Sequence, residues 1–150
     1  MVAYCEYKIL EFDKLVIEVY RNEFTFDAAM AERMNVFNDI NFCSGLNFLI
    51  DVRRTIYNVS YQSTKNFRDF IVSSVNAKQM NKIAILTNTP QQVAAAMFFG
   101  YAQTELINNY NVFSTLEVAL QWLKIDEKRT AVISSELNQL ANALHVSPNS

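Results

Sequence analysis

A chain of 150 residues, 51% of them hydrophobic and 19% charged, has enough apolar material for one domain of ordinary size and lacks the composition of a disordered protein. The formal net charge is -2 and the 13 basic residues are scattered, so we expect no nucleic-acid partner, since that binding needs clustered cations. No segment approaches the roughly 20 apolar residues that span a bilayer, and we expect a soluble, cytoplasmic protein with no membrane span.

The start of the chain predicts a β-hairpin followed by a helix. Residues 7–12 and 15–20 are rich in β-branched and aromatic side chains, and two polar residues separate them. Behind Thr25, an expected N-cap, apolar residues recur at helical spacing as far as Phe37. An antiparallel pair of strands therefore precedes the first helix.

Strands and helices alternate in the middle of the chain. Residues 48–52 are apolar on both faces, as in a central parallel strand, and Arg53 and Arg54 are expected to end it. A second helix begins after Ser60, and residues 83–87 predict another short buried strand.

The starts of the next two helices carry a recognisable signal. Residues 89–92 and 114–117 both fit the capping box, in which a hydroxyl and a Glu or Gln three residues later satisfy free amides. A minimal strand at 112–113 precedes the second of these helices, and apolar spacing predicts a last helix over 130–144.

The predicted order, ββαβαβαβα, is typical of an α/β domain with a single mixed sheet of about five strands covered by helices. It comprises an N-terminal hairpin and then βαβαβα crossovers. We expect residues 1–125 to form this domain. Residues 126–150 would be a C-terminal helical extension packed on the same domain.

Catalytic and cofactor-binding motifs are missing from the sequence. Neither Gly45 nor Gly100 stands in a glycine-rich strand-to-helix turn, which excludes the usual phosphate cradles. The single histidine, His145, has no partner in sequence, and Cys5 and Cys43 form no CxxC pair and are expected to be reduced. We therefore expect no metal, no cofactor and no enzymatic activity. Gly100, inside a predicted helix, indicates either close backbone packing or simple tolerance.

Three strings of residues resemble a known family. Residues 49–53 (LIDVR) predict a strand that carries Asp-x-Arg, residues 83–88 (IAILTN) a second strand, and residues 112–123 (VFSTLEVALQWL) a short strand, a cap and a closing helix. The pattern resembles the STAS/SEC14-like domain proteins over residues 7–123. The resemblance implies the fold of sporulation anti-sigma-factor antagonists, which act by protein contact and are switched by serine phosphorylation. SEC14-type relatives instead bind lipid in an apolar pocket.

A ligand or partner edge is predicted where the parallel strands end. Ligands of open α/β sheets lie beyond the carboxyl ends of the strands, which points to Asp51, Arg53, Arg54, Asn88 and Thr89. The arginines could grip a carboxylate or a phosphate. Alternatively, Asp51 pairs with a neighbouring arginine or accepts loop amides, because a buried carboxylate must be satisfied.

Ser60 and Ser63 have two candidate roles at the start of the second helix. Hydroxyls there cap the helix, and a phosphate there would also be stabilised by the helix dipole, so both serines are candidate phosphorylation sites. Our leading hypothesis is a non-catalytic regulatory or protein-interaction module whose partner is another protein or a second copy in a homodimer. The alternative is a domain that binds a lipid or a small apolar or anionic ligand at the carboxyl edge of the strands.

Overall fold

A single mixed sheet organises the chain, as predicted. The computed structural model describes residues 2–102 and 109–143. The first strand runs antiparallel to the second and the remaining pairs are parallel, in the spatial order β1-β2-β3-β4-β5. The strands are β1 (Ala3–Leu10), β2 (Leu15–Phe24), β3 (Asn47–Tyr57), β4 (Ile83–Leu86) and β5 (Tyr110–Phe113).

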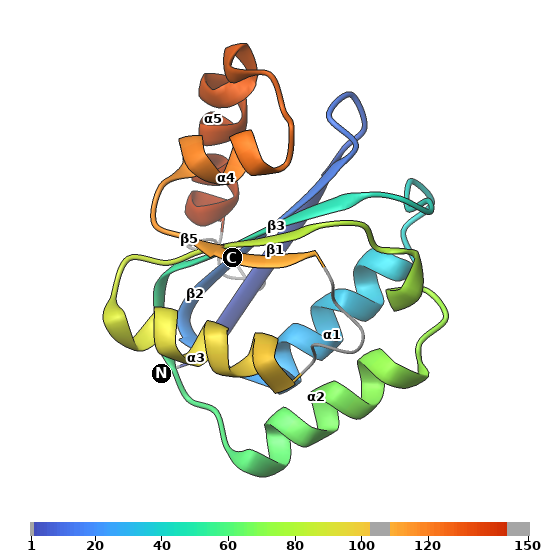
Figure 1. The fold of residues 1–150 in the computed structure, drawn as a ribbon, viewed down its shortest axis with the longest axis vertical. Coiled ribbons are helices and arrows are strands. Elements are labelled where there is room, and N and C mark those ends of the chain that lie inside the picture. Colours follow the sequence, from blue (N-terminus) through green and yellow to red (C-terminus); the bar gives the residue numbers. More distant parts are fainter. Residues whose placement is uncertain (1, 103–108, 144–150) are drawn as a thin grey trace.

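Helices cover both faces of the sheet (Figure 1). One face carries α1 (Phe26–Phe37), α2 (Tyr61–Ser73) and α3 (Pro90–Ala102), and the other carries α4 (Leu116–Trp122) and α5 (Thr130–Ala143). Short 3-10 turns, η1 (Ala77–Gln79) and η2 (Glu127–Arg129), precede β4 and α5. Because β2 to β5 follow each other in sequence order, crossovers of one hand must place α1, α2 and α3 on the same face.

Each face of the sheet has its own hydrophobic core. Along β2, Val16 and Tyr20 point toward α1, α2 and α3, whereas Leu15, Ile17 and Val19 point toward α4 and α5. Strand residues alternate between faces, so one buried strand supplies both cores. The second core is completed by α4 and by the buried face of α5, formed by Ile133, Leu137 and Ala141.

Three of the predicted helix starts are confirmed and one is wrong. Thr25 and Ser60 are N-caps of α1 and α2, and the Thr89 hydroxyl accepts from the Gln92 amide at the start of α3. The predicted box at 89–92 forms only in part, because the Gln92 side chain accepts from the amide of Asn88, the residue before the cap. The predicted box from Ser114 to Glu117 does not form. Thr115 is the N-cap instead, because it has the extended backbone from which its hydroxyl accepts from the Val118 amide.

The third strand is longer than predicted. It continues through Arg53 and Arg54 to Tyr57, so the expectation that the arginines end it is wrong. The reason is β2, which pairs with β3 as far as Phe24 and so keeps it extended, whereas β4 pairs with β3 only from Phe48 to Asp51. Beyond Asp51 the β4-facing edge of β3 therefore needs other hydrogen-bond partners.

Gln92 of α3 supplies those partners. Its side-chain amide donates to the carbonyls of Thr55 (2.9 Å) and Arg53 (3.3 Å), and its side-chain oxygen accepts from the Asn88 amide at 2.7 Å. The residue is buried. One glutamine thus joins the uncovered half of β3 to the start of α3.

We expect Gln92→Glu to lower the free energy of unfolding by about 2–4 kcal/mol at neutral pH, because a buried carboxylate would face two carbonyl oxygens in place of an amide donor. The loss should shrink in acid, where a protonated carboxyl can donate one hydrogen bond. Urea denaturation at both pH values measures it. Gln91→Glu, at an exposed position on the same helix, is the control and should change stability little. Equal effects of the two substitutions would contradict the role given to Gln92.

Candidate functional site

Asp51, the first residue of the predicted edge, is completely buried inside β3 and faces α4 and α5. Its two oxygens accept from the backbone amide of Arg53 (3.1 Å), from the Arg53 guanidinium (2.9 and 2.8 Å) and from Arg54 (3.4 Å). The structure therefore contains the pairing with neighbouring arginines that the sequence left open as one of two alternatives. A buried carboxylate with these four bonds is satisfied.

A bulge in β3 brings both arginines to Asp51. Asp51 pairs with Val19 of β2 and Arg54 pairs with Arg21, so three steps along β3 match two along β2. The extra residue changes the direction of the side chains that follow it, so that both Arg53 and Arg54 can approach the carboxylate of Asp51. Arg54 also reaches the Asn138 side chain of α5 at 3.3 Å. The arginines are thus engaged with Asp51 and α5.

Asn88 and Thr89 lie on a separate, shallow groove of about 500 Å³ at the carboxyl ends of β4 and β5. Pro90, Val93 and Met97 of α3 and Ser114 of the following turn also line it. Asp51, Arg53 and Arg54 do not line this groove. The predicted edge is therefore divided in two, and Gln92 connects the parts through the Arg53 carbonyl and the Asn88 amide.

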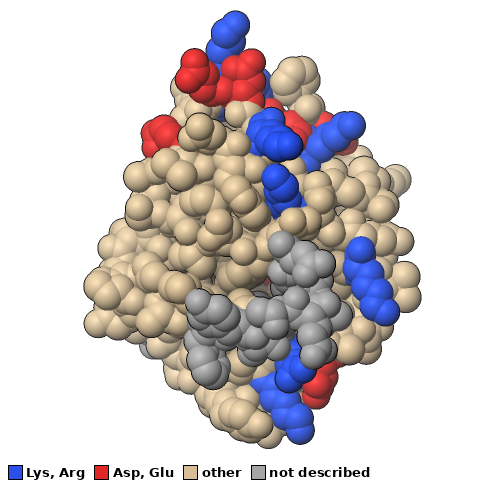
Figure 2. Space-filling view, viewed as in Figure 1, with Lys and Arg blue, Asp and Glu red and all other residues tan. Residues whose placement is uncertain are grey.

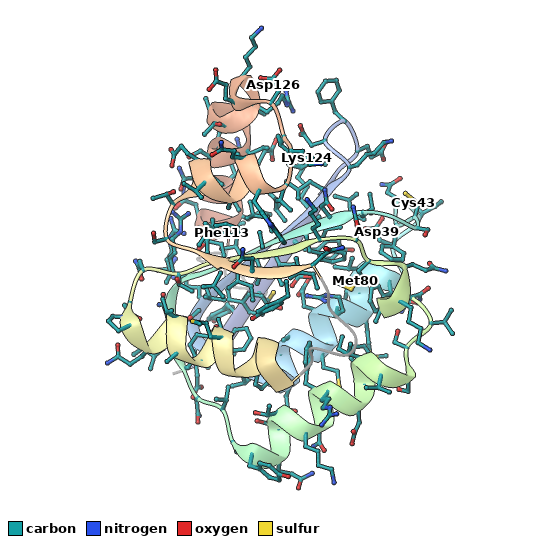
Figure 3. All side chains as sticks on the ribbon, in the orientation of Figure 1. Asp39, Cys43, Met80, Phe113, Lys124 and Asp126 are labelled. Carbon is teal, nitrogen blue, oxygen red and sulfur yellow. The ribbon has the colours of Figure 1, made fainter. Side chains whose placement is uncertain are left out.

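A pocket that was not predicted from the sequence lies between the sheet and α1, α2 and η1. Its volume is about 70 Å³ and its walls are mostly aromatic and aliphatic. Met80, which Figure 3 places under the sheet beside α1, forms part of the wall. The lining residues are Tyr20, Phe24, Phe26, Ala29, Arg33, Ile50, Val52, Tyr57, Phe67, Ile71, Ala77, Lys78, Met80, Ile83, Ile85 and Tyr110.

Gly100 helps to shape this apolar pocket. A Cβ atom at Gly100 would lie 2.5 Å from the ring of Tyr110, which lines the pocket. The Tyr110 hydroxyl donates to the Ala96 carbonyl of the same helix at 2.6 Å. Of the two explanations for a glycine inside this helix, close packing is the one the structure shows. It was the one signal in the sequence that pointed to the pocket wall.

Polar groups are few in the apolar pocket. Tyr57, partly buried, forms no hydrogen bond through its hydroxyl to another described residue, and burial raises its pKa. Lys78 is exposed and lines the pocket from η1. Arg33 is buried and already bound to Glu18, with only the Met80 sulfur near its remaining nitrogen at 3.5 Å. The pocket thus offers a free hydroxyl and an exposed ammonium group.

A buried ionic cluster adjoins this pocket through Arg33 and Tyr20. Arg33 of α1 donates two bonds to Glu18 of β2, at 2.9 and 3.2 Å, and the Tyr20 hydroxyl donates a third at 2.9 Å. Glu32, next to Arg33, is also buried, and Cys5 lies within hydrogen-bonding reach of Glu32. Burial, followed by the charge of Glu18, raises the pKa of Glu32 to about 7.

We expect the folded state to lose stability as the pH rises from the pKa of Glu32 in the unfolded chain to its pKa in the folded protein. The Glu32 carboxyl ionises near about 4.3 in an unfolded chain and near about 7 when folded. Between these values the folded state binds more protons, so a rise in pH favours unfolding. Glu32→Gln should remove this dependence of stability on pH. At pH values above the folded-state pKa of Glu32, it should raise the free energy of unfolding by about 1–3 kcal/mol.

Chemical denaturation over a pH series measures the effect of Glu32→Gln. The exposed Glu127→Gln is the control, since it changes the charge equally without touching the cluster. A wild-type slope that survives in Glu32→Gln would contradict the assignment.

Ser60 and Ser63 form the reciprocal capping box of α2. Each side chain bonds to the backbone amide of the other, both at 3.0 Å. The structure therefore shows the capping role. Phosphorylation of either serine stays a proposal.

Other candidate chemistry is limited in the described residues. Cys5 and Cys43 are both free thiols, and burial raises the pKa of Cys5. Within residues 2–102 and 109–143 no three His, Cys, Asp or Glu side chains gather as a metal site would require. His145 lies outside the described residues. None of the described helices combines the length and apolar character needed to cross a bilayer.

Charged side chains are unevenly distributed on the face seen in Figure 2. They gather mainly at the end of the molecule that carries η2, where both signs occur, and most of the remaining surface in this view is uncharged. The view contains no continuous basic stripe. This agrees with the scattered basic residues of the sequence.

Comparison with known proteins supports the fold. No family model matches the sequence, and no curated protein matches it. Among solved structures, the chain is similar to an uncharacterised protein of the DUF3478 family with a SpoIIAA-like fold from Shewanella loihica PV-4. The TM-score is 0.54 at 13% identity, over 81% of this chain and 93% of that one. The likeness confirms the STAS/SpoIIAA-like fold that the sequence resemblance implied, and at this identity it concerns the fold alone.

Proposed function

We propose that this SpoIIAA-like domain is a non-catalytic binding module that holds a small apolar ligand in the pocket between the sheet and α1, α2 and η1. The single observation that carries the proposal is the apolar pocket itself, with its aromatic and aliphatic walls and its free Tyr57 hydroxyl. Pockets of this kind, apolar with a few polar groups, are the usual sites for small molecules. The ligand would thus lie on one face of the sheet, whereas the sequence had predicted a ligand at the carboxyl edge of the strands.

The ligand class follows from the lining of the apolar pocket. A volume of about 70 Å³ encloses only a short alkyl chain or a similar group. The Tyr57 hydroxyl can donate a hydrogen bond to a polar end of that ligand. Lys78 would favour a ligand whose polar end is anionic. Arg33 contributes less to this preference, because its charge is balanced by Glu18.

Linear alcohols of increasing length test the proposal. Affinity should rise about fourfold for each added methylene, since each buried methylene contributes about 0.8 kcal/mol, until the apolar pocket is full. Binding should shift the methyl NMR signals of Ile50, Ile83 and Ile85, which line the pocket. A lack of shifts at these methyls with every alcohol would overturn the proposal.

Ala77→Leu should weaken alcohol binding, because Ala77 is partly buried in the pocket wall and a larger side chain would occupy the space. Ala31→Leu, at an exposed position on α1, is the matched control and should bind as the wild type does. Carboxylates of the same chain length should bind more tightly than the alcohols, and Lys78→Met should remove that difference.

Protein interaction is a second candidate function, and the free outer edge of β1 favours it. The strand has a sheet partner on one side alone within the described part of the chain. An edge strand presents unpaired amides and carbonyls to another chain. This function does not depend on the ligand pocket, since the pocket lies over β2 to β5.

A further inference from the structure

We infer that β1 pairs antiparallel, along its outer edge, with β1 of a second copy of this chain, so that two sheets join into one. The strand forms an unbroken ladder of eight residue pairs with β2, from Ala3 opposite Asn22 to Leu10 opposite Leu15. It contains no proline and no bulge, two of the features that commonly protect an edge strand. The edge is therefore long and regular enough to accept another strand.

The geometry of such a pair restricts its register. A two-fold axis perpendicular to the sheet keeps α5 of both copies on one face, so residues of the same face must lie opposite each other. On β1, Glu6 and Lys8 lie on one face and Cys5, Tyr7 and Ile9 on the other, packed toward the core beneath α1. The permitted registers therefore differ by steps of two residues.

Charge selects one of these registers. When Tyr7 lies opposite Tyr7 of the second copy, Glu6 lies opposite Lys8 of that copy, and the pair occurs twice. The two neighbouring registers instead place either Glu6 or Lys8 opposite its own symmetry mate. Opposite charges across a ladder stabilise it and like charges destabilise it, so the first register is favoured.

The two side chains are available for this pairing. Glu6 is exposed and forms no ion pair with another described residue. The Lys8 ammonium is 2.8 Å from Glu136 of α5, but the side chain is 49% exposed and an ammonium group has three donors. Lys8 can therefore bind Glu136 and a second carboxylate together.

Apolar contact adds to the same register. Tyr4 lies on the face of Glu6 and Lys8 and is 38% exposed. In the register selected by charge it faces Leu10 of the second copy, which is partly buried in the core beneath α5. Pairing would thus cover the part of this aromatic side chain that a single copy leaves exposed.

The oligomeric state of the full chain and of charge-reversed variants tests the inference. Sedimentation velocity over a wide range of protein concentration should show the wild type as a dimer that weakens at high salt. Glu6→Lys and Lys8→Glu should each raise the dissociation constant of the dimer about tenfold or more, since two attractive pairs become repulsive. Lys128→Glu, an exposed reversal on η2, is the control and should leave the dimer unchanged.

Mixing the two variants provides the decisive measurement. Glu6→Lys and Lys8→Glu should form a mixed dimer of near wild-type affinity, because each supplies the charge that the other lacks. This outcome separates pairing from a folding defect, since Lys8→Glu also loses the bond to Glu136. Hydrogen exchange should show the amides of β1 protected as the protein concentration rises.

Three results would overturn the inference. The first is a wild type that stays monomeric at every concentration. The second is a mixture of the variants that forms no mixed dimer. The third is concentration-dependent protection confined to segments other than β1. Alcohol binding in the apolar pocket is independent of all three, so the proposed ligand function stands or falls separately.

Discussion

The unequal lengths of β3 and β4 are the constraint on which most of this structure depends. Because β3 has eleven residues and β4 has four, half of β3 has no strand beside it on that edge. Buried backbone groups in a folded domain need hydrogen-bond partners. On this half of β3 the side-chain amide of Gln92, from α3, donates to the carbonyls of Arg53 and Thr55. The position of α3 follows from this contact, and α3 in turn packs against β5 through Gly100 and Tyr110.

The part of β3 that extends past β4 also contributes to the apolar pocket. Val52 and Tyr57, from the half of β3 that extends past β4, line it together with residues of α1 and α2. The space between this part of the sheet and the helices α1 and α2 is lined by large aromatic rings that do not fill it completely.

On each face of the sheet, one described strand residue is a carboxylate with no exposure to solvent. Glu18 faces α1 and is neutralised by Arg33 from that helix, whereas Asp51 faces α4 and α5 and is neutralised by Arg53 and Arg54 of its own strand. A buried charge is tolerated only when it is paired and hydrogen-bonded, so each pair restricts what can pack against that face. The arginines that looked like an anion site from the sequence are engaged in this structural role. That engagement is why our proposal for ligand binding turns to the pocket, where Tyr57 is free.

The sequence by itself determined the order of the elements, the single mixed sheet, the hydroxyl caps at Thr25 and Ser60, and the α/β fold confirmed by the structural comparison. These depend on local periodicity and on hydrogen bonds between near neighbours, which a sequence records directly. Only the tertiary structure decided how far β3 extends, which carboxylate each arginine meets, and where the apolar pocket opens. Those outcomes arise from pairing with β2, from a bulge, and from packing between segments distant in the chain. The sequence signals that packing only at Gly100, and it does not show which residues a segment will contact.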